Sequence, residues 1–580
     1  MGCRYLLLRR EGGDAVAAVA PEKLERLCSM GLQERYVCAD AMLFASPETP
    51  TLRIPDAGII IGHVFLNDGT PLHDTSPFLA SLTRETAGSL LLNECWGEYV
   101  LVQPGAGGAS PLRIARDPSG GVACIRSTSD RTGFLTSDIS IATRLGLYER
   151  RVDWDFIAHF LAYPYVKSAR TGLQHIHELL PGCAVNLSGT NAVVEQVWSP
   201  WDFVAPPRRQ TSIEDAAAEL RTVVERTVKA WAGVDGSALV ELSGGLDSSI
   251  VAASLRGTPA RVFCATLVPK LPGADERMYA SAVARGLETD LHVGALDVDD
   301  ARFEEPVPPW CVTPDAGPLQ HAVDRTMEEL AARNDLHCFY SGGGGDTVFG
   351  YLGGAAPAAD AFRERGPVAA IRTIRYLAEL HRCTFWLAAR LTLRMLGAPH
   401  NRPQRANEEL LDRSRATGSP DHHPWADAPR NALPGDRERV SGLAGTQLFR
   451  DTLPRGMQRW FRLPLLSQPV MEACLSIPTW MWVAGGRNRA VARLAFSDIL
   501  PEHVLHRGSK GSFSQYNGAV YRRNKDAMRR FLLEGQLQAH GLIDVDALSR
   551  FFERPLSPRD RSFMRIFDLC RTENWVRHQS

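Results

Sequence analysis

The chain has 580 residues, too many for one ordinary hydrophobic core, so the sequence predicts two domains. Its 65 Lys and Arg residues against 66 Asp and Glu residues give a formal net charge of -1, which argues against nucleic acid or an anionic membrane as a general partner. The cysteines are scattered without zinc-site spacing, and neither a signal peptide nor a run of about 18 apolar residues is present, so we expect a cytoplasmic protein with reduced thiols.

The first part of the chain, residues 1–205, alternates short apolar runs with turn residues. This spacing is typical of strands joined by tight turns. Prolines at positions 200, 206 and 207 end the pattern, and a helical period begins behind Ser212 and covers residues 213–232. A domain boundary is therefore predicted between residues 205 and 206. The apolar runs are Gly58–Phe65, Glu98–Gln103, Leu112–Arg116, Val122–Ile125 and Ala184–Leu187.

From residue 206 onward, apolar strands alternate with amphipathic helices. This alternation predicts a parallel sheet with crossover helices, and therefore an α/β fold for residues 206–580. The predicted strands are Ala238–Leu242, Arg261–Leu267, Leu291–Leu296 and His337–Tyr340, and the predicted helices are Ser248–Leu255, Glu276–Gly286 and His321–Arg333.

The later part of this second domain gives weaker patterns. Residues 398–442 are rich in proline and lack a sustained apolar period, so we expect a flexible insert there. The sequence from Arg459 to the end is rich in Trp and Arg and predicts helices. The basic stretch near Arg522 is most simply a solvated helix face, although it could also dock a peptide.

Two glycine-rich loops follow predicted strands: Ser243–Ser248 and Ser341–Asp346. Glycine lets backbone N–H groups approach a phosphate closely, and a helix N-terminus favours its negative charge. Neither loop has the Walker or the dinucleotide-binding pattern. Each contains one acid, Asp247 or Asp346, which would repel a phosphate unless a cation lay between them. The pair predicts a site for ATP with Mg²⁺.

The sequence around these loops resembles the asparagine synthetase B family. Residues 240–249 resemble the pyrophosphate loop of that family, and residues 341–351 resemble its second signature. Three further matches keep the same order: residues 263–267 resemble the strand that contacts adenine, residues 464–466 the Pro-Phe-Leu-Asp box, and residues 507–513 the Arg/Lys loop.

The first domain resembles the class II glutamine amidotransferase scaffold. The matching segments are Ile61–Phe65, Arg116–Gly120 and Leu135–Asp138. The two resemblances together imply an Ntn-hydrolase-like αββα sandwich over residues 1–205. They imply an ATP-pyrophosphatase domain of the adenine nucleotide α hydrolase type over residues 206–580.

The family resemblance also assigns roles to residues. It implies that Asp247 and Asp346 bind Mg²⁺ and take part in catalysis, and that Lys510 stabilises charge at the reacting acyl centre. The residues implied to bind ATP and pyrophosphate are Leu242, Ser243, Gly244, Gly245, Leu246, Asp247, Ser248, Ala265, Ser341 and Gly342.

Three departures separate the chain from asparagine synthetases. Cys3 follows Gly2 and so cannot be the first residue after removal of Met1, although the glutaminase needs a free α-amine on that cysteine. Ile61 stands where the scaffold has an oxyanion-binding asparagine. Gly343 replaces a glutamate or, in β-lactam synthetases, a tyrosine. We therefore expect a degenerate first domain that releases no ammonia.

This combination resembles the lasso-peptide cyclases, which are macrolactam synthetases. The resemblance implies adenylation of an Asp or Glu side chain of a leader-free core peptide, followed by attack of the peptide's own α-amine. A ribosomally made precursor, a leader peptidase and a leader-binding protein are the implied partners. The general base stays open among His321, Glu276 and the departing phosphate.

The sequence is also compatible with other functions. The chain could be a small-molecule amide or β-lactam synthetase of the same family, or an asparagine synthetase that uses free ammonia. It could also be a non-catalytic scaffold that binds peptide, although both acids and both glycine loops are present.

Overall fold

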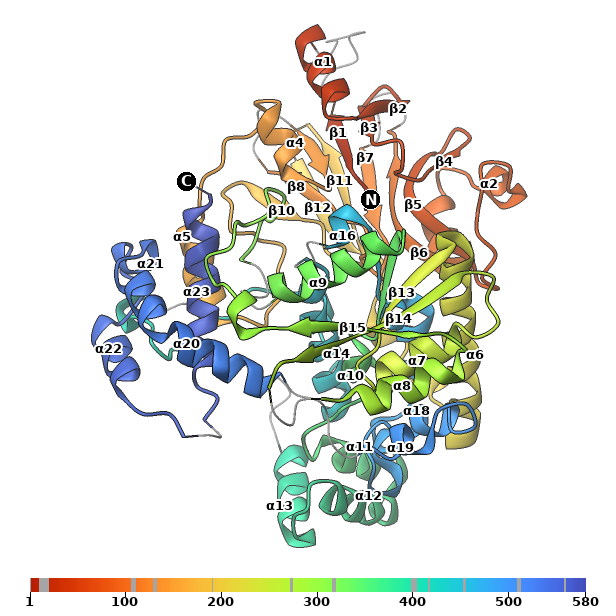
Figure 1. The fold of residues 1–580 in the computed structure, drawn as a ribbon. Helices are drawn as coiled ribbons and strands as arrows, with labels where there is room; N and C mark the ends of the chain where they lie inside the picture. Colours follow the sequence, from red (N-terminus) through yellow and green to blue (C-terminus); the bar gives the residue numbers. More distant parts are fainter. Residues whose placement is uncertain are drawn as a thin grey trace.

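The computed structural model describes residues 2–9, 20–105, 111–128, 133–189, 191–271, 275–314, 320–397, 404–415, 418–451, 455–507, 513–557 and 560–579. Over these ranges the chain forms two six-stranded antiparallel sheets and one five-stranded parallel sheet (Figure 1). The predicted α/β class is confirmed. None of the helices in the described ranges is both long and apolar enough to cross a membrane.

The N-terminal domain is a sandwich of the two antiparallel sheets. The first sheet has the order β10-β8-β9-β1-β3-β2 and the second has the order β12-β11-β7-β6-β5-β4. Their strands are β1 (Tyr5–Arg9), β2 (Gln33–Val37), β3 (Ala41–Ala45), β8 (Ile125–Ser127), β9 (Phe134–Thr136), β10 (Ile176–Glu178), and β4 (Thr51–Ile54), β5 (Gly58–Leu66), β6 (Cys95–Gln103), β7 (Leu112–Arg116), β11 (Cys183–Ser188), β12 (Asn191–Gln196).

Alternating side chains explain the layers of this sandwich. Leu7 of β1 packs against Ile59 and Val100 of the other sheet, whereas Leu6 points to the opposite side, because successive strand residues face opposite ways. On that outer side lie α4 (Ile139–Arg144) and α5 (Trp154–Ala162). Helix α3 (Ala87–Glu94) covers the second sheet. The predicted αββα sandwich is therefore confirmed.

The second domain is built on the parallel sheet, with strand order β15-β14-β13-β16-β17. The order reverses between β13 and β16, so the crevice at their carboxyl ends is the expected ligand site. The strands are β13 (Ser237–Glu241), β14 (Arg261–Pro269), β15 (Leu291–Leu296), β16 (Cys338–Ser341) and β17 (Trp460–Arg462), and the crossover helices are α7 (Leu246–Ser254), α8 (Arg277–Gly286) and α9 (Gln320–Arg333).

One prediction for this sheet is wrong. Residues 460–462 were expected in a helix, but they form β17, which pairs in parallel with β16. A three-residue strand is too short to show a period in sequence, and its pairing partner lies more than a hundred residues away. Phe461 lies opposite Phe339 in this ladder, and the strand completes the sheet edge.

Two helical regions extend the second domain. Helices α11 (Ala356–Arg365), α12 (Pro367–Leu380) and α13 (Phe385–Leu396) form an arm at the lower edge of Figure 1. Helices α20 (Ser514–Leu533), α22 (Val545–Glu553) and α23 (Met564–Arg577) pack together beside α5 of the first domain.

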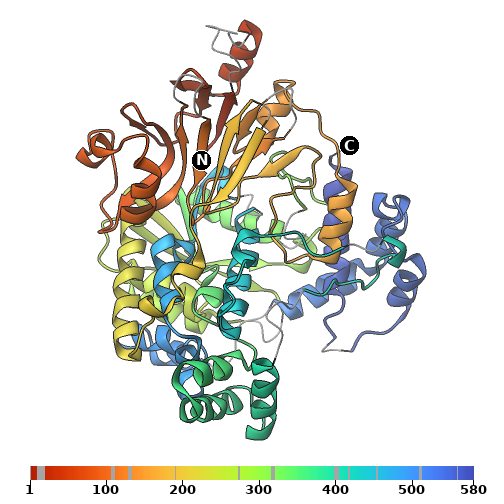
Figure 2. The same cartoon turned by 180° about the vertical axis from the view of Figure 1, so that it is seen from behind.

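The described part of the predicted insert makes contacts with both domains. Asn407 N–H donates to the carbonyl of Ala162 at 2.7 Å, and Leu411 forms an isolated bridge with Ile543. Figure 2, the view from behind, shows this segment running toward the C-terminal helices. The insert ends in helix α14 (Pro434–Thr446). Burial of Trp425 anchors the segment between the domains.

Candidate active site

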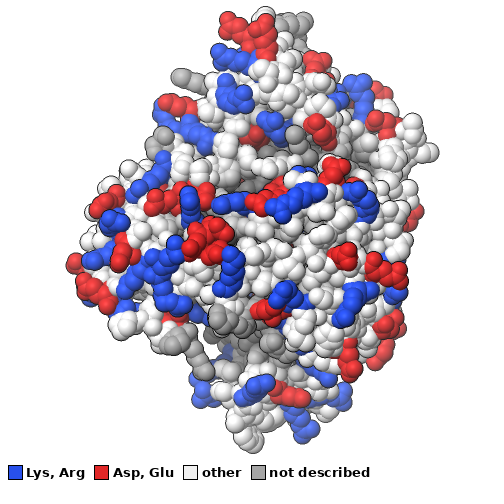
Figure 3. Space-filling model, viewed as in Figure 1, with Lys and Arg blue, Asp and Glu red and all other residues white. Residues whose placement is uncertain are grey.

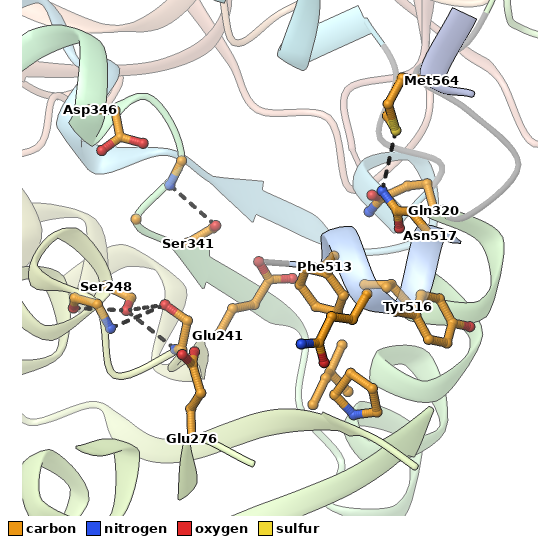
Figure 4. A pocket seen from close by; sticks show the side chains of 18 of the residues that line it. Glu241, Ser248, Glu276, Gln320, Ser341, Asp346, Phe513, Tyr516, Asn517 and Met564 are labelled. Carbon is orange, nitrogen blue, oxygen red and sulfur yellow. Dashed lines mark hydrogen bonds between the residues drawn. The ribbon is translucent and has the colours of Figure 1, made fainter. Parts of the chain in front are cut away.

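A cleft of about 1840 Å³ opens at the carboxyl ends of the parallel strands. The loops after β13 and β16 form one wall, and they are neighbours because their strands are paired. Figure 4 shows Ser248, Ser341 and Asp346 on this side of the cleft. The two glycine loops therefore meet at the switch point of the sheet, where open α/β folds bind ligands.

The first loop is held in shape by its two serines. The hydroxyls of Ser243 and Ser248 lie 3.1 Å apart, and the N–H of Gly245 donates to Ser243 Oγ at 3.3 Å (Figure 4). Gly244 has a φ of +66°, and a Cβ there would lie 2.4 Å from that of Tyr279. Glycine is required at this position, and the loop delivers the N-terminus of α7 to the cleft.

The second loop packs directly on the first. A Cβ at Gly342 would lie 2.4 Å from the backbone nitrogen of Ser248, and one at Gly345 would lie 2.5 Å from Cβ of Asp247. Any larger residue would separate the two loops, because backbone cannot move aside as a flexible side chain can. The glycines thus allow the two loops to form one surface, of a kind that suits phosphate.

Asp247 and Asp346 converge on a single cationic group in this surface. Nη1 of Arg489 lies 2.9 Å from both carboxylate oxygens of Asp247 and 3.0 Å from Oδ1 of Asp346. Arg489 also has a φ of +54°, an uncommon conformation for a residue with a side chain. Sequence reasoning missed this arginine, which belongs to no motif considered there.

The same pair of carboxylates fits a magnesium ion. Mg²⁺ prefers oxygen ligands from one or two carboxylates together with phosphate oxygens. The oxygens of these two carboxylates meet at one point, which Nη1 of Arg489 occupies in this structure. The described residues contain no cluster of three or more His, Cys, Asp and Glu side chains suited to a metal. A cation would therefore depend on Asp247, Asp346 and the nucleotide itself.

Three further arginines line this end of the cleft. Arg507 donates to the carbonyl of Gly244 at 3.1 Å and pairs with Glu276. Arg455 pairs with Glu241 behind the loops. Burial, together with the neighbouring positive charge of Arg489, lowers the pKa of Arg493 to about 10, so this side chain is still charged at neutral pH. The arrangement is suited to a polyanion.

Most of the residues that the sequence analysis assigned to the site line the cleft. Gly244 instead faces α8, and Lys510 lies outside the described residues. Of the two candidate bases, Glu276 lines the cleft, while His321 is absent from the described lining. Burial lowers the pKa of His321. The assigned residues that line the cleft are Leu242, Ser243, Gly245, Leu246, Asp247, Ser248, Ala265, Ser341, Gly342 and Asp346.

The region of Cys3 in the first domain is closed. Burial raises the pKa of the Cys3 thiol to about 12, although the positive charge of Arg462 opposes this rise. Arg462 itself is fully buried and pairs with Glu98 of β6 at 2.8 Å and with Asp235 at 2.8 Å, the last residue of α6 (Ile213–Asp235). A neutral, buried thiol is a poor nucleophile. The position of Ile61 is likewise buried, in the core between the sheets.

The model of the asparagine synthase family matches residues 219–577, which is more than half of the chain. The chain belongs to the asparagine synthase family. Members of this family are typically ATP-dependent carbon–nitrogen ligases, and the cleft with its two loops lies within the matched residues. At family level the activity is ATP-dependent amide formation.

Other comparisons add little beyond the family. No curated protein matches the chain significantly. One similar solved structure is glutamine phosphoribosylpyrophosphate amidotransferase from B. subtilis, with 10% identity over 58% of this chain and 90% of that one, at a TM-score of 0.22. Another is the allosteric regulatory enzyme of purine biosynthesis, with 11% identity, 53% and 77% coverage, and a TM-score of 0.20. Scores this low say nothing about activity.

Proposed function

We propose that the protein is an ATP-dependent macrolactam synthetase, a lasso-peptide cyclase. It adenylates an Asp or Glu side chain of a leader-free core peptide and releases pyrophosphate. The peptide's N-terminal amine then attacks the acyl-adenylate, and an isopeptide bond and AMP are formed. The proposed partners are the ribosomally made precursor, a leader peptidase and a leader-binding protein.

The size of the cleft is the observation that carries this proposal. Its volume of about 1840 Å³ exceeds the range of about 300–1,000 Å³ that is usual for small-molecule sites. Gly343 also lines the cleft, and a Cβ there would lie 2.8 Å from Cδ2 of Leu463, so the glycine packs closely on that side chain. A folded peptide needs such space beside the nucleotide, whereas aspartate and ammonia do not.

The closed first domain supports an amine that arrives with the substrate. Glutamine hydrolysis by this fold would require an accessible, activated cysteine, but Cys3 is buried with a raised pKa. The fully buried Arg462 bridges the two domains beside it. An internal peptide amine removes the need for an ammonia source.

The residues of the cleft can supply the charge stabilisation for this reaction. The loops offer backbone N–H groups and the N-terminus of α7 to the polyphosphate. Arg489, Arg493 and Arg507 place positive charge where pyrophosphate leaves. Mg²⁺ held by Asp247 and Asp346 would neutralise phosphate oxygens. Lys510 keeps its proposed role at the acyl centre.

Glu276 is the candidate base that the geometry favours. It lies in the cleft wall, next to the first loop, whereas His321 does not belong to the described lining. Its carboxylate pairs with Arg507, which positions it in the cleft wall. A proton from the attacking amine could pass to this carboxylate or to the departing phosphate.

Incubation with a linear core peptide tests the proposal. With ATP and Mg²⁺, the peptide should lose one water, and AMP and pyrophosphate should appear in equal amounts. The same peptide with an acetylated N-terminus should be adenylated but not cyclised. Amide formation on a free amino acid, or labelled asparagine from aspartate and ammonium, would instead establish one of the small-molecule alternatives.

A further inference from the structure

The cleft continues well past the nucleotide loops, to a second wall made of C-terminal residues. We call this the distal wall and define it by Phe513, Tyr516, Arg522, Lys525, Arg561 and Met564. Figure 4 shows Phe513, Tyr516 and Met564 on the opposite side of the cleft from Ser248 and Ser341. The glycine loops therefore form one end of this cavity, and C-terminal residues form the other end.

The distal wall is positively charged. The C-terminal lining contains Arg522, Lys525, Arg554 and Arg561 but a single acid, Asp560, and this acid is paired with Arg554 at 3.2 Å. Among the described residues, no ion-pair partner faces Arg522, Lys525 or Arg561. Figure 3 shows Lys and Arg side chains gathered over α20.

The next basic residue of α20 lies outside the cleft and has an ion-pair partner. Arg523 follows Arg522 directly, does not line the cleft, and forms an ion pair with Asp299. Simple solvation of a basic helix would not distinguish the two faces in this way. The cations inside the cleft have no ion-pair partner among the described residues, whereas the neighbouring cation outside it does. Such cations are suited to an anionic ligand.

Large apolar side chains lie among these cations. Phe513 is 47% exposed and Met564 is 41% exposed, and both line the cleft. A nucleotide has its phosphates at the glycine loops and would not need this surface. Apolar side chains interspersed with positive charge instead match a peptide that carries both carboxylates and apolar groups.

We propose that the distal wall binds the carboxylate-bearing tail of a linear peptide substrate. This inference rests on the proposed function, because the reacting carboxylate and amine must both lie at the nucleotide loops. Only the part of the peptide beyond the ring-forming residues can then reach the distal wall. Holding this tail in place reduces the entropy lost at ring closure and keeps the peptide folded while the bond forms.

Two probe peptides test the wall separately from turnover. The acidic probe is an N-acetylated hexapeptide that alternates apolar residues with glutamate and has a free carboxyl terminus. The neutral probe has glutamine and a terminal amide instead. Neither can cyclise, because neither has an α-amine. By isothermal titration calorimetry on the full chain, the acidic probe should bind about tenfold more tightly, as expected for two or three partly exposed charge pairs.

A charge-matched pair of variants locates the effect. Arg522→Gln with Lys525→Gln should remove most of the preference for the acidic probe. Arg523→Gln with Arg530→Gln, on the same helix but outside the cleft lining, should leave the preference intact. Unchanged ATP binding and melting temperature in both variants would show that folding is preserved.

The outcomes distinguish this inference from the proposed function. Equal binding of both probes, or a preference that survives Arg522→Gln with Lys525→Gln, overturns the distal wall even if macrolactam forms. Acidic-probe binding that depends on these two residues supports the wall. If such binding occurs while linear core peptides are never cyclised, the proposed reaction fails and the anionic peptide site stands.

Discussion

Two groups of ion pairs in this molecule use the same chemistry in different surroundings. Glu98, Asp235 and Arg462 are buried at the interface between the domains, beside the closed region of Cys3. Asp247, Asp346 and Arg489 pair at similar distances but line an open cleft. Charges that face only each other can fasten two domains together, whereas charges that face a cleft can also exchange partners with a ligand.

The loss of a charge should have different consequences in the two groups of ion pairs. In the cleft, a lost charge should reduce catalysis and leave the fold intact. At the interface, it should reduce stability, because the remaining partner stays buried and unpaired.

Asp247→Ala and Asp346→Ala should each abolish ATP-dependent AMP formation, a loss of at least about a hundredfold, because charge neutralisation at the phosphates is removed. AMP is measured by chromatography and folding by the melting temperature, which should change little. Asp299→Asn, on the surface, is the control. Substantial activity in either alanine variant would show that these acids hold no metal.

Arg489→Met should lower AMP formation by about tenfold to a hundredfold, because its guanidinium is the positive charge shared by the two acids. Steady-state kinetics with varied ATP measures the loss. Arg487→Met, in the preceding turn and outside the cleft lining, should retain activity. An equal loss in both variants would point to a general disturbance of the turn.

Arg462→Met should destabilise the protein by about 3–5 kcal/mol, because Glu98 and Asp235 lose a buried partner. The shift of the urea unfolding midpoint measures this cost. Arg113→Met removes a more exposed pair with Glu195 and should cost less than about 1 kcal/mol. If both substitutions have the same small effect, the buried pairs do not fasten the domains.

Cys3→Ala should change activity very little, since the thiol is buried and has no proposed part in the reaction. In the folded protein, Cys3 should also resist alkylation by iodoacetamide between pH 7 and pH 9, because a pKa of about 12 leaves almost no thiolate there. Peptide mapping by mass spectrometry identifies the modified cysteines. Rapid alkylation of Cys3, or loss of activity in Cys3→Ala, would revive a catalytic first domain.

The sequence was sufficient to predict that the two glycine loops meet. The strands that became β13 and β16 have clear apolar runs, and the Ser-Gly-Gly loops directly follow them, so the meeting of Asp247 and Asp346 could be predicted. The strand alternation likewise predicted that these strands run parallel in one sheet, because helical crossovers join parallel strands.

Other features depend on contacts that sequence patterns do not contain. β17 is too short to show a period, and Arg462 at its end is recognisable only from its buried partners. Arg489 reaches the acids from a turn far along the chain. The cleft-facing role proposed for Arg522 and Lys525 contradicts the simpler expectation of a solvated face, and only the shape of the cleft separates them from Arg523.

The source of the nitrogen is the most direct test of the proposed reaction. The linear core peptide is incubated with ATP, Mg²⁺ and ¹⁵N-labelled ammonium, and the product is analysed by mass spectrometry. An internal acceptor predicts a dehydrated peptide without ¹⁵N, with its N-terminal amine joined to an Asp or Glu side chain. A peptide or free amino acid carrying a ¹⁵N-labelled amide, with no dehydrated product, would contradict it.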